Sequence, residues 1–377
     1  MEKILIKEVQ SAKELNRFLA FPNALYNGNP YRVPQLFGFE RSTLSPSKNP
    51  AHAFCKTKYF LAYKGQQVVG RIAGIIHERA NEKWNEHRVR FGWIDFVDDI
   101  TVSAALIQAV EDWGKSEGMT AIHGPLGFSD MDLEGMLIDG FDELGTQAVI
   151  YNHPYYPVHM ELLGFAKDVD WVQIEINLPK RVPEKIKRYA ALVSERYELR
   201  PLKVKKAKEI LPYAKKMFHT LNAAFVDLYG FVQLTDEQID YYIKQYFSIV
   251  KPEYICFVLD KNDDVAGFGI SMPSLSKALI KARGKLFPFG FIPVLQSIYG
   301  KNDMIDMYLI GIRPDYQGKG VHAIFFNEMT QAYIDHGIKL AISSPQLENN
   351  SDALKLWKHY EYREHIRRRC FIKHFES

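Results

Sequence analysis

Two stretches of the chain share one pattern of apolar runs separated by a polar turn. Residues 59–76 (YFLAYKGQQVVGRIAGII) have their turn at 64–67, and residues 254–272 (YICFVLDKNDDVAGFGISM) have theirs at 261–264. Each pattern predicts a β-hairpin. The two turns begin 197 positions apart (261 − 64), and the glycines at 70 and 267 show the same offset. This common offset indicates an internal duplication.

The same offset relates later segments. Gly164-Phe165 precedes a strand-like run, WVQIEINL, and Glu361-Tyr362 precedes another, CFIKHF. Both halves are therefore predicted to run strand, helices, hairpin, strand, helix, strand, helix, strand. The first residues, MEKILIKEVQ, alternate like an edge strand. A length of 377 residues suits two domains, which we predict over residues 1–178 and 179–377.

Composition excludes several classes of function. Lysine and arginine total 48 and aspartate and glutamate total 45, so no global basic field favours nucleic acid, and no nucleic-acid partner is predicted. Three scattered cysteines predict no disulfide framework and suit a reducing cytoplasm. No histidine or cysteine spacing typical of a metal site appears, so no metal is predicted. No window reaches the roughly 18 apolar residues that a membrane span needs.

The most informative segment is Met304–Gly337. Ile305–Ile312 is mostly apolar and predicts a buried strand, which Arg313-Pro314-Asp315 ends. The turn Gln317-Gly318-Lys319-Gly320 then leads into apolar residues at helical spacing. A glycine-rich turn at a helix start offers free backbone N–H groups and the positive end of the helix dipole, which together suit a pyrophosphate.

This segment and the next resemble the GNAT acyltransferase superfamily. In that family the signature Gln/Arg-x-x-Gly-x-Gly/Ala binds the pyrophosphate of coenzyme A, and here Gln317, Gly320 and His322 fall on it. A predicted strand at Ile338–Pro345 and a short helix after Asn349-Asn350 follow, as in the family. Its next motif, Asn-x-x-Ala-x-x-x-Tyr-x-x-x-Gly-Phe, falls on Asn350, Ala353, Trp357, Glu361 and Tyr362.

The resemblance implies an α/β fold of the α+β kind, with two tandem GNAT-like domains. Each would be a mixed, mostly antiparallel sheet flanked by helices. It covers the second half well, whereas the first half matches in its element order and in Gly164-Phe165. It implies that the second half binds coenzyme A or acyl-CoA as a co-substrate, through Ile310, Gly311, Ile312, Gln317, Gly318, Lys319, Gly320, Val321, His322, Asn350 and Trp357.

Two departures from the family bear on chemistry. The motif tyrosine commonly protonates the leaving thiolate of coenzyme A, and Trp357 cannot do so. His322 replaces a small residue and would either add a donor to the phosphates or crowd them. In the first half, Asp98-Asp99 follows the strand Phe91–Val97 and caps a helix at 103–117 directly. Two carboxylates would repel a pyrophosphate, so the first half is predicted to be a degenerate partner.

Acyl transfer to an amine needs a proton acceptor for the amine and hydrogen-bond donors for the thioester carbonyl. The resemblance places those donors on the backbone of the strand that ends at Ile312. Asp306 and Tyr308 share one face of that strand, and Glu348 follows a strand end, so these three are the candidate catalytic residues. Asp227 and Tyr229 would lie where the family has its substrate loop; the alternative is packing and turn roles.

The insertion Pro273–Met304 is the best indication of substrate. Four cations over nine positions precede LFPFGFIPVL, a pattern typical of an element at a membrane surface. Under this interpretation Phe287, Phe289 and Phe291 form a wall for a long acyl chain, and the protein is cytoplasmic with peripheral contact at the inner membrane surface. The alternative is a lid packed over the first half.

The whole layout is similar to a bacterial group of two-domain GNAT proteins, some of which are linked to N-acylation of sphingoid bases, that is, to ceramide formation. We therefore expect an acyl-CoA-dependent N-acyltransferase acting on a small-molecule or lipid amine. The alternatives are a non-catalytic GNAT-fold protein that binds coenzyme A, and a scaffold. The sequence leaves acyl length, acceptor and oligomeric state open.

Overall fold

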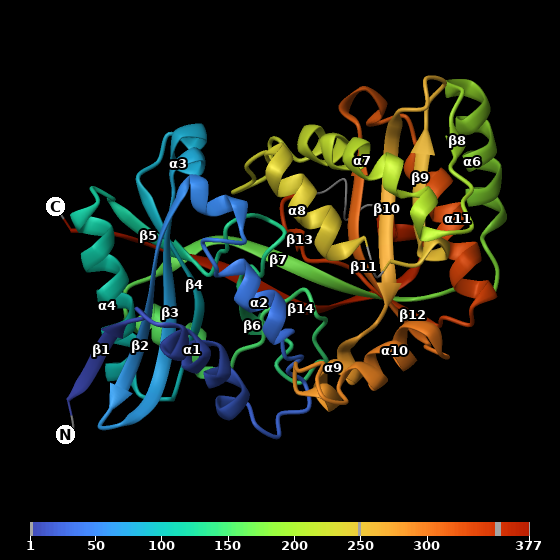
Figure 1. Ribbon diagram of the computed structural model, residues 1–377. Coiled ribbons are helices and arrows are strands. Elements are labelled where there is room, and N and C mark those ends of the chain that lie inside the picture. Colours follow the sequence, from blue (N-terminus) through green and yellow to red (C-terminus); the bar gives the residue numbers. More distant parts are fainter. Residues whose placement is uncertain (1–2, 248–249, 351–355, 377) are drawn as a thin grey trace.

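The computed structural model describes residues 3–247, 250–350 and 356–376, which form two lobes joined by one continuous β-sheet (Figure 1). The strand order is β1-β2-β3-β4-β5-β14-β7-β12-β11-β10-β9-β8, with β6 paired to β14 and β13 paired to β7. Among these pairs β4–β5 and β11–β12 are parallel and the others are antiparallel. The fold class is the predicted one, a mixed and mostly antiparallel sheet flanked by helices.

The first lobe follows the predicted element order. Its strands are β1 (Ile4–Glu8), β2 (Cys55–Lys64), β3 (Gln67–His77), β4 (Arg88–Phe96), β5 (Ala121–Gly124) and β6 (Met136–Asp139). Its helices are α1 (Ala12–Leu25), α2 (Phe37–Thr43), α3 (Glu78–Trp84), α4 (Ile100–Ser116) and α5 (Tyr155–Leu162). The edge strand and the first hairpin are confirmed. Asp99 caps α4 as predicted, because its side chain accepts from the Thr101 N–H at 3.0 Å.

The second lobe repeats this order of strands, with an extra helix before its first strand and two helices after its hairpin. Its strands are β8 (Arg200–Pro201), β9 (Ile255–Leu259), β10 (Val265–Pro273), β11 (Met304–Ile312), β12 (Leu340–Ile342) and β13 (Gln346–Leu347). Its helices are α6 (Glu184–Tyr197), α7 (Leu211–Ala224), α8 (Asp236–Tyr246), α9 (Ser276–Ala282), α10 (Phe291–Tyr299) and α11 (His322–Asp335). The second hairpin is confirmed. Helices α9 and α10 make up the insertion.

Strands β7 (Ala166–Asn177) and β14 (Glu361–His374) run between the lobes as an antiparallel ribbon (Figure 1). The end of β14 pairs with β5 in the first lobe, with Phe371 opposite Gly124. The end of β7 pairs with β12 in the second lobe, with Asn177 opposite Leu340. Each half of the chain therefore supplies a strand to the sheet of the other, so the segments 1–178 and 179–377 share one sheet.

Two predicted boundaries differ from the structure. The strand predicted at 338–345 is shorter, since β12 ends at Ile342 and the chain then turns to β7. There the Ser343 N–H donates to the Ile174 carbonyl at 2.8 Å, and the Ser343 hydroxyl accepts from the Ile174 N–H at 2.9 Å. Strand β14 begins at Glu361, earlier than the apolar run indicated, because its polar first part pairs with β7. The short helix predicted after Asn350, with Ala353, falls mainly on 351–355, outside the described residues.

The second-lobe sheet is covered on both faces. One apolar cluster joins it to α7, α8 and the insertion, with Phe218, Phe257 and Phe268 at its centre. The other joins it to α6 and α11, through Phe325 and Met329 among others. No helix in the described part of the chain has the length and apolar character to cross a bilayer.

Candidate acyl-transfer site

The site begins where β11 and β12 separate. The two parallel strands pair only over Met304–Asp306 and Leu340–Ile342. Strand β11 continues to Ile312, whereas the chain after β12 joins β7, so the strands open into a wedge. Met307–Ile312 line one side of the wedge and Ser343–Leu347 line the other. On the opened side the β11 backbone has no strand partner among the described residues, and its N–H groups can meet a ligand carbonyl.

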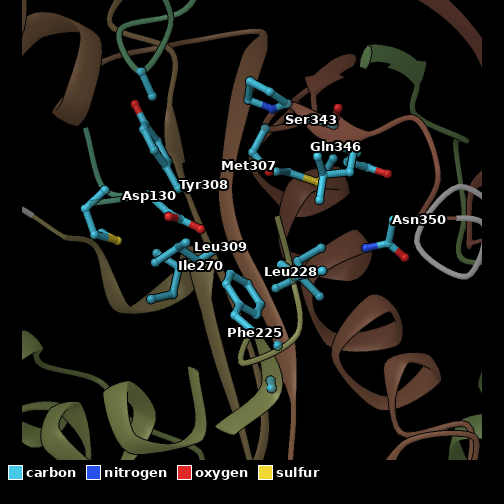
Figure 2. Close-up of a pocket in the computed structure, with 18 of the residues that line it drawn as sticks. Asp130, Phe225, Leu228, Ile270, Met307, Tyr308, Leu309, Ser343, Gln346 and Asn350 are labelled. Atoms are coloured by element: carbon cyan, nitrogen blue, oxygen red, sulfur yellow. The ribbon is translucent and has the colours of Figure 1, made fainter. Parts of the chain in front are cut away.

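A β-bulge turns the middle of β11 toward the cavity. Ile270 of β10 lies opposite Leu309, and Ser271 lies opposite Met307, so Tyr308 is the additional residue. As a result Tyr308 and Leu309 both lie on the side of the sheet that carries α7 and α8. Both side chains line the cavity, and Figure 2 shows them on one wall with Ile270.

The glycine turn lies at the open end of the wedge. Gln317 is fixed by its side-chain N–H, which donates to the Ile312 carbonyl at 3.1 Å. Gly318 has φ +71°, and a Cβ added there would meet no atom within 4 Å, so the backbone borders open space. The N–H groups of Gly318, Gly320 and Val321 have no partner among the described residues. With the start of α11 behind them, these groups fit a phosphate.

Helix α6 covers the other side of this turn. Lys185, Ile186 and Tyr189 of this helix all line the cavity. Gly320 has φ +80°, a backbone conformation that favours glycine, and the exposed Tyr189 ring lies directly over it. The exposed Lys185 ammonium adds positive charge to the lining, a contribution that the sequence analysis missed.

The first lobe supplies an acidic loop to the same cavity, at Asp130, Asp132 and Glu134. The Asp132 carboxylate closes the loop by accepting from the Phe128 and Ser129 N–H groups at 2.8 and 3.2 Å. Asp130 and Glu134 have no hydrogen bond or ion pair among the described residues. Burial raises the pKa of Asp130 to about 7, of Asp132 to about 6, and of Glu134 well above its usual range.

One cavity joins these features. Its volume is about 1270 Å³, more than the roughly 300–1,000 Å³ usual for small-molecule sites. In Figure 2, Asp130 from the first lobe and Asn350 from the second lie on the wall of this cavity, together with Phe225 and Leu228. Much of the remaining wall is apolar, including Phe39, Met131, Leu133, Tyr246, Phe247 and Val250. The lining therefore combines a phosphate-binding turn, an acidic loop and an apolar wall.

Comparison with known structures identifies the fold. A tandem GNAT protein from the clavulanic acid biosynthesis pathway matches over 100% of both chains, with a TM-score of 0.56 and 10% identity. A GCN5-related N-acetyltransferase from Sphaerobacter thermophilus matches over 99% of this chain and 96% of its own, with a TM-score of 0.53 and 9% identity.

The chain has the tandem GNAT fold. Two curated proteins are also similar in sequence. Protein YghO of Escherichia coli is 28% identical over 83% of this chain and 80% of its own. Bacterial ceramide synthase of Caulobacter vibrioides is 26% identical over 82% of this chain and 80% of its own. No family model matches the chain.

The predicted coenzyme-binding residues of this GNAT fold are largely brought together. Ile310, Gly311, Ile312, Gln317, Gly318, His322, Asn350 and Trp357 line the cavity, whereas Lys319, Gly320 and Val321 lie beside its lining. Lys319 places its ammonium 5.3 Å from the ring centre of Tyr197 and 5.2 Å from that of Tyr316. The residues present therefore fit the pyrophosphate of coenzyme A.

The family's tyrosine position is occupied by a buried tryptophan. The Trp357 N–H donates to the Gln346 side-chain oxygen at 3.2 Å, and its ring packs 5.4 Å from that of Phe326. Tyr360, three positions later, also lines the cavity and shares a hydrogen bond of 3.5 Å with the Thr330 hydroxyl. The Tyr360 phenol therefore lies three residues from the position at which the family has its tyrosine.

The three predicted catalytic residues are not brought together. Tyr308 lines the cavity, but Asp306 does not. Asp306 is 2% exposed, both carboxylate oxygens have no hydrogen-bond partner among the described residues, and burial raises its pKa to about 7. Glu348 lies outside the lining and forms ion pairs with Lys167 at 2.5 Å and Arg367 at 3.1 Å. This pairing on the ribbon argues against a role for Glu348 as the base.

The predicted substrate loop reaches the cavity, since both Asp227 and Tyr229 line it. Tyr229 is anchored by its hydroxyl, which donates to Asp168 at 2.6 Å and lies 3.4 Å from His123 and 3.5 Å from the Cys370 sulfur. His123, Asp168 and Cys370 offer metal-ligand atoms within 4.8 Å of one another. The Tyr229 hydroxyl is thus hydrogen-bonded to this group of three side chains.

The predicted acyl wall is placed elsewhere. Phe287, Phe289 and Phe291 do not line the cavity, and they are 81%, 71% and 38% exposed. The phenylalanines of the insertion face outward because Val294 and Ile298 supply its inward contacts. The apolar wall inside the cavity comes from α2, α8 and the acidic loop, which the sequence pattern did not reveal.

Proposed function

We propose that the protein is an N-acyltransferase that moves an acyl group from coenzyme A to an amine bound between the lobes. One observation carries this proposal: a single cavity is lined by the GNAT phosphate turn of the second lobe and by the acidic loop of the first. The GNAT fold of acetyltransferases and the similarity to a ceramide synthase support acyl transfer in general.

The second lobe would hold the acyl donor. Backbone N–H groups of Gly318, Gly320 and Val321, with Lys185 nearby, would bind the phosphates. The wedge between β11 and the Ser343–Leu347 segment would receive the thioester arm. The unpaired backbone of Ile310–Ile312 would donate to the carbonyl oxygen, where negative charge develops as the amine adds.

The first lobe would hold the acceptor amine. The Asp130 carboxylate forms no ion pair among the described residues, and a pKa of about 7 lets it take a proton near neutral pH. The amine nitrogen forms the new bond to the thioester carbon, and its proton goes to Asp130. The carbon–sulfur bond then breaks, and the Tyr360 phenol, whose pKa burial raises, supplies a proton to the leaving thiolate.

The apolar wall favours a bulky acceptor or acyl group. A hydrocarbon chain gains about 0.8 kcal/mol for each methylene that leaves water, and a cavity of about 1270 Å³ can bury many of them. The relative named bacterial ceramide synthase acts, by that name, on a lipid. We therefore propose a lipid amine of the sphingoid-base class as the acceptor and a long-chain acyl-CoA as the donor.

The phosphate turn is tested by a matched pair of variants, Gly318→Asp and Gly318→Asn. Asparagine and aspartate both tolerate positive φ better than other side chains, so the pair differs chiefly in charge. We expect the aspartate variant to bind coenzyme A about ten-fold or more weakly than the asparagine variant, by calorimetry. Equal affinities in the two variants would contradict the proposed phosphate site.

Turnover separates an enzyme from the alternative, a GNAT-fold protein that binds coenzyme A without catalysis. The buried Trp357 is the observation that favours that alternative. Release of the coenzyme A thiol from palmitoyl-CoA, measured with and without a long-chain amine, decides between them. Amine-dependent thiol release supports the transferase, and tight binding with no release supports the binding protein.

A further inference from the structure

The insertion exposes a concentrated apolar surface, here called the α9–α10 face. Its large apolar side chains lie within thirteen positions of the chain and are Phe287, Phe289, Phe291, Ile292, Leu295 and Tyr299. Three of them are more than two thirds exposed: Phe287 at 81%, Phe289 at 71% and Tyr299 at 68%. Isolated exposed apolar residues are ordinary, but a contiguous set marks a contact surface.

Helix α10 is apolar on both sides. Val294 and Ile298, one turn apart, are buried against the second-lobe core. Ile292, Leu295 and Tyr299 point away from that core and are exposed. A helix on a protein surface normally turns polar residues outward, so the apolar outer side of α10 favours a contact surface.

The same insertion carries exposed positive charge. Lys277, Lys281, Arg283, Lys285 and Lys301 are all exposed, and Asp303 is the one acidic residue in Pro273–Met304. None of the five cations forms an ion pair among the described residues. Since the whole chain carries a formal net charge of only +3, this is a local concentration of charge.

The insertion also contacts first-lobe segments that line the cavity. The Gly284 carbonyl accepts from the Phe37 N–H at 3.0 Å, and the Ser276 hydroxyl donates to the Gly145 carbonyl at 2.9 Å. Their chain neighbours Gln35 and Gln147 line the cavity. The α9–α10 face therefore lies beside one end of the site, at the lower rim of the molecule in Figure 1.

We propose that the α9–α10 face docks on an anionic lipid bilayer. Exposed phenylalanines would enter the acyl boundary while the cations meet lipid phosphates, as in interfacial helices. A second copy of this chain fits poorly, because a symmetric contact would bring five cations against five. An acyltransferase with an amphiphilic substrate gains from such docking, but lipid binding does not depend on that activity.

Vesicle flotation tests the docking with the full-length protein. Vesicles of pure phosphatidylcholine are compared with equimolar phosphatidylcholine and phosphatidylglycerol. We expect binding to the anionic vesicles, weakened by added salt. Phe287→Ser with Phe289→Ser, and separately Lys281→Glu with Lys285→Glu, should each lower the bound fraction by about ten-fold or more.

Matched control variants remove exposed apolar side chains, or reverse positive charge, at surfaces away from the α9–α10 face. Val158→Ser with Leu162→Ser removes exposed apolar residues from α5, and Lys205→Glu with Lys208→Glu makes the same charge change away from the face. Both controls should bind vesicles like the parent protein, and all variants should keep its melting temperature. The proposal is overturned if the parent does not bind anionic vesicles, if the controls lose binding equally, or if the face instead mediates self-association without vesicle binding.

Discussion

At the scale of the residue, two carboxyls have the same raised pKa but different surroundings. Burial brings the pKa of both Asp130 and Asp306 to about 7. Asp130 faces the cavity, where a cationic amine can compensate its charge. Asp306 is enclosed by protein, 2% exposed and without a hydrogen bond among the described residues. Geometry rather than pKa therefore decides which of them can reach a substrate.

We predict that Asp130 sets the acidic limb of the pH–rate profile. An acid with a pKa of about 7 is protonated below that pH and cannot accept a proton, so kcat/KM should rise as pH increases through 7. Asp130→Asn should lower kcat/KM by roughly 10²–10⁴-fold and abolish the limb. The measurement is amine-dependent thiol release from pH 5 to pH 9.

Asp306→Asn is the control for this experiment, and we expect it to change the stability of the fold rather than the pH–rate profile. A folded-state pKa above the unfolded value of about 3.9 means that the native chain binds more protons. The contribution of Asp306 to the free energy of unfolding is therefore fully present at low pH and is lost as pH rises to about 7. The asparagine variant should thus unfold at higher temperature than the parent at pH 8 and keep the acidic limb. If its limb disappears instead, Asp306 is the base.

At the scale of the element, the sequence predicted the helices, strands and turns that depend on local patterns of residues. The hairpins, the edge strand, the cap by Asp99 and the strand–turn–helix at 305–335 all arise from contacts between near neighbours. The glycine turn was likewise visible. What the pattern missed depends on distant segments: the turn of Ser343 to β7, the approach of α6 to Gly320, and the acidic loop that the first lobe turns toward β11. An amphipathic helix such as α6 shows that it has a buried side, but not what buries it.

We predict one coenzyme A per chain, because the element equivalent to α11 in the first lobe is closed to phosphate. The start of α4 is occupied by the Asp99 side chain, which accepts from the Thr101 N–H. Asp98 adds a second carboxylate, 3.1 Å from His159. Calorimetric titration of the parent with coenzyme A should give a stoichiometry near one. Two equivalent sites would show that these carboxylates do not exclude the phosphates.

At the scale of the whole molecule, the ribbon of β7 and β14 makes the two lobes interdependent. The sequence indicated a duplication and two domains, since each half has the pattern of a full set of strands. The exchange escaped prediction because the apolar pattern of a strand indicates which of its faces is buried, but not which other strand lies beside it. Arg368 of β14 shows how specific the result is: it is buried, and its guanidinium donates to the Gln173 side chain and the Ile150 carbonyl, both at 3.0 Å.

Because each half supplies a strand to the sheet of the other, we predict that neither half folds alone. A fragment of residues 1–178 lacks β14, which leaves β5 without its outer neighbour, and a fragment of 179–377 lacks β7, which leaves β12 unpaired on one side. Exposed strand edges of this kind favour aggregation. Each fragment expressed alone should show no cooperative thermal transition, whereas the two expressed together should give a soluble complex with one transition and coenzyme A affinity near that of the intact chain. A cooperative transition in fragment 1–178 alone would mean that its sheet is complete without β14, and coenzyme A binding by fragment 179–377 alone would mean that the wedge beside β11 forms without β7.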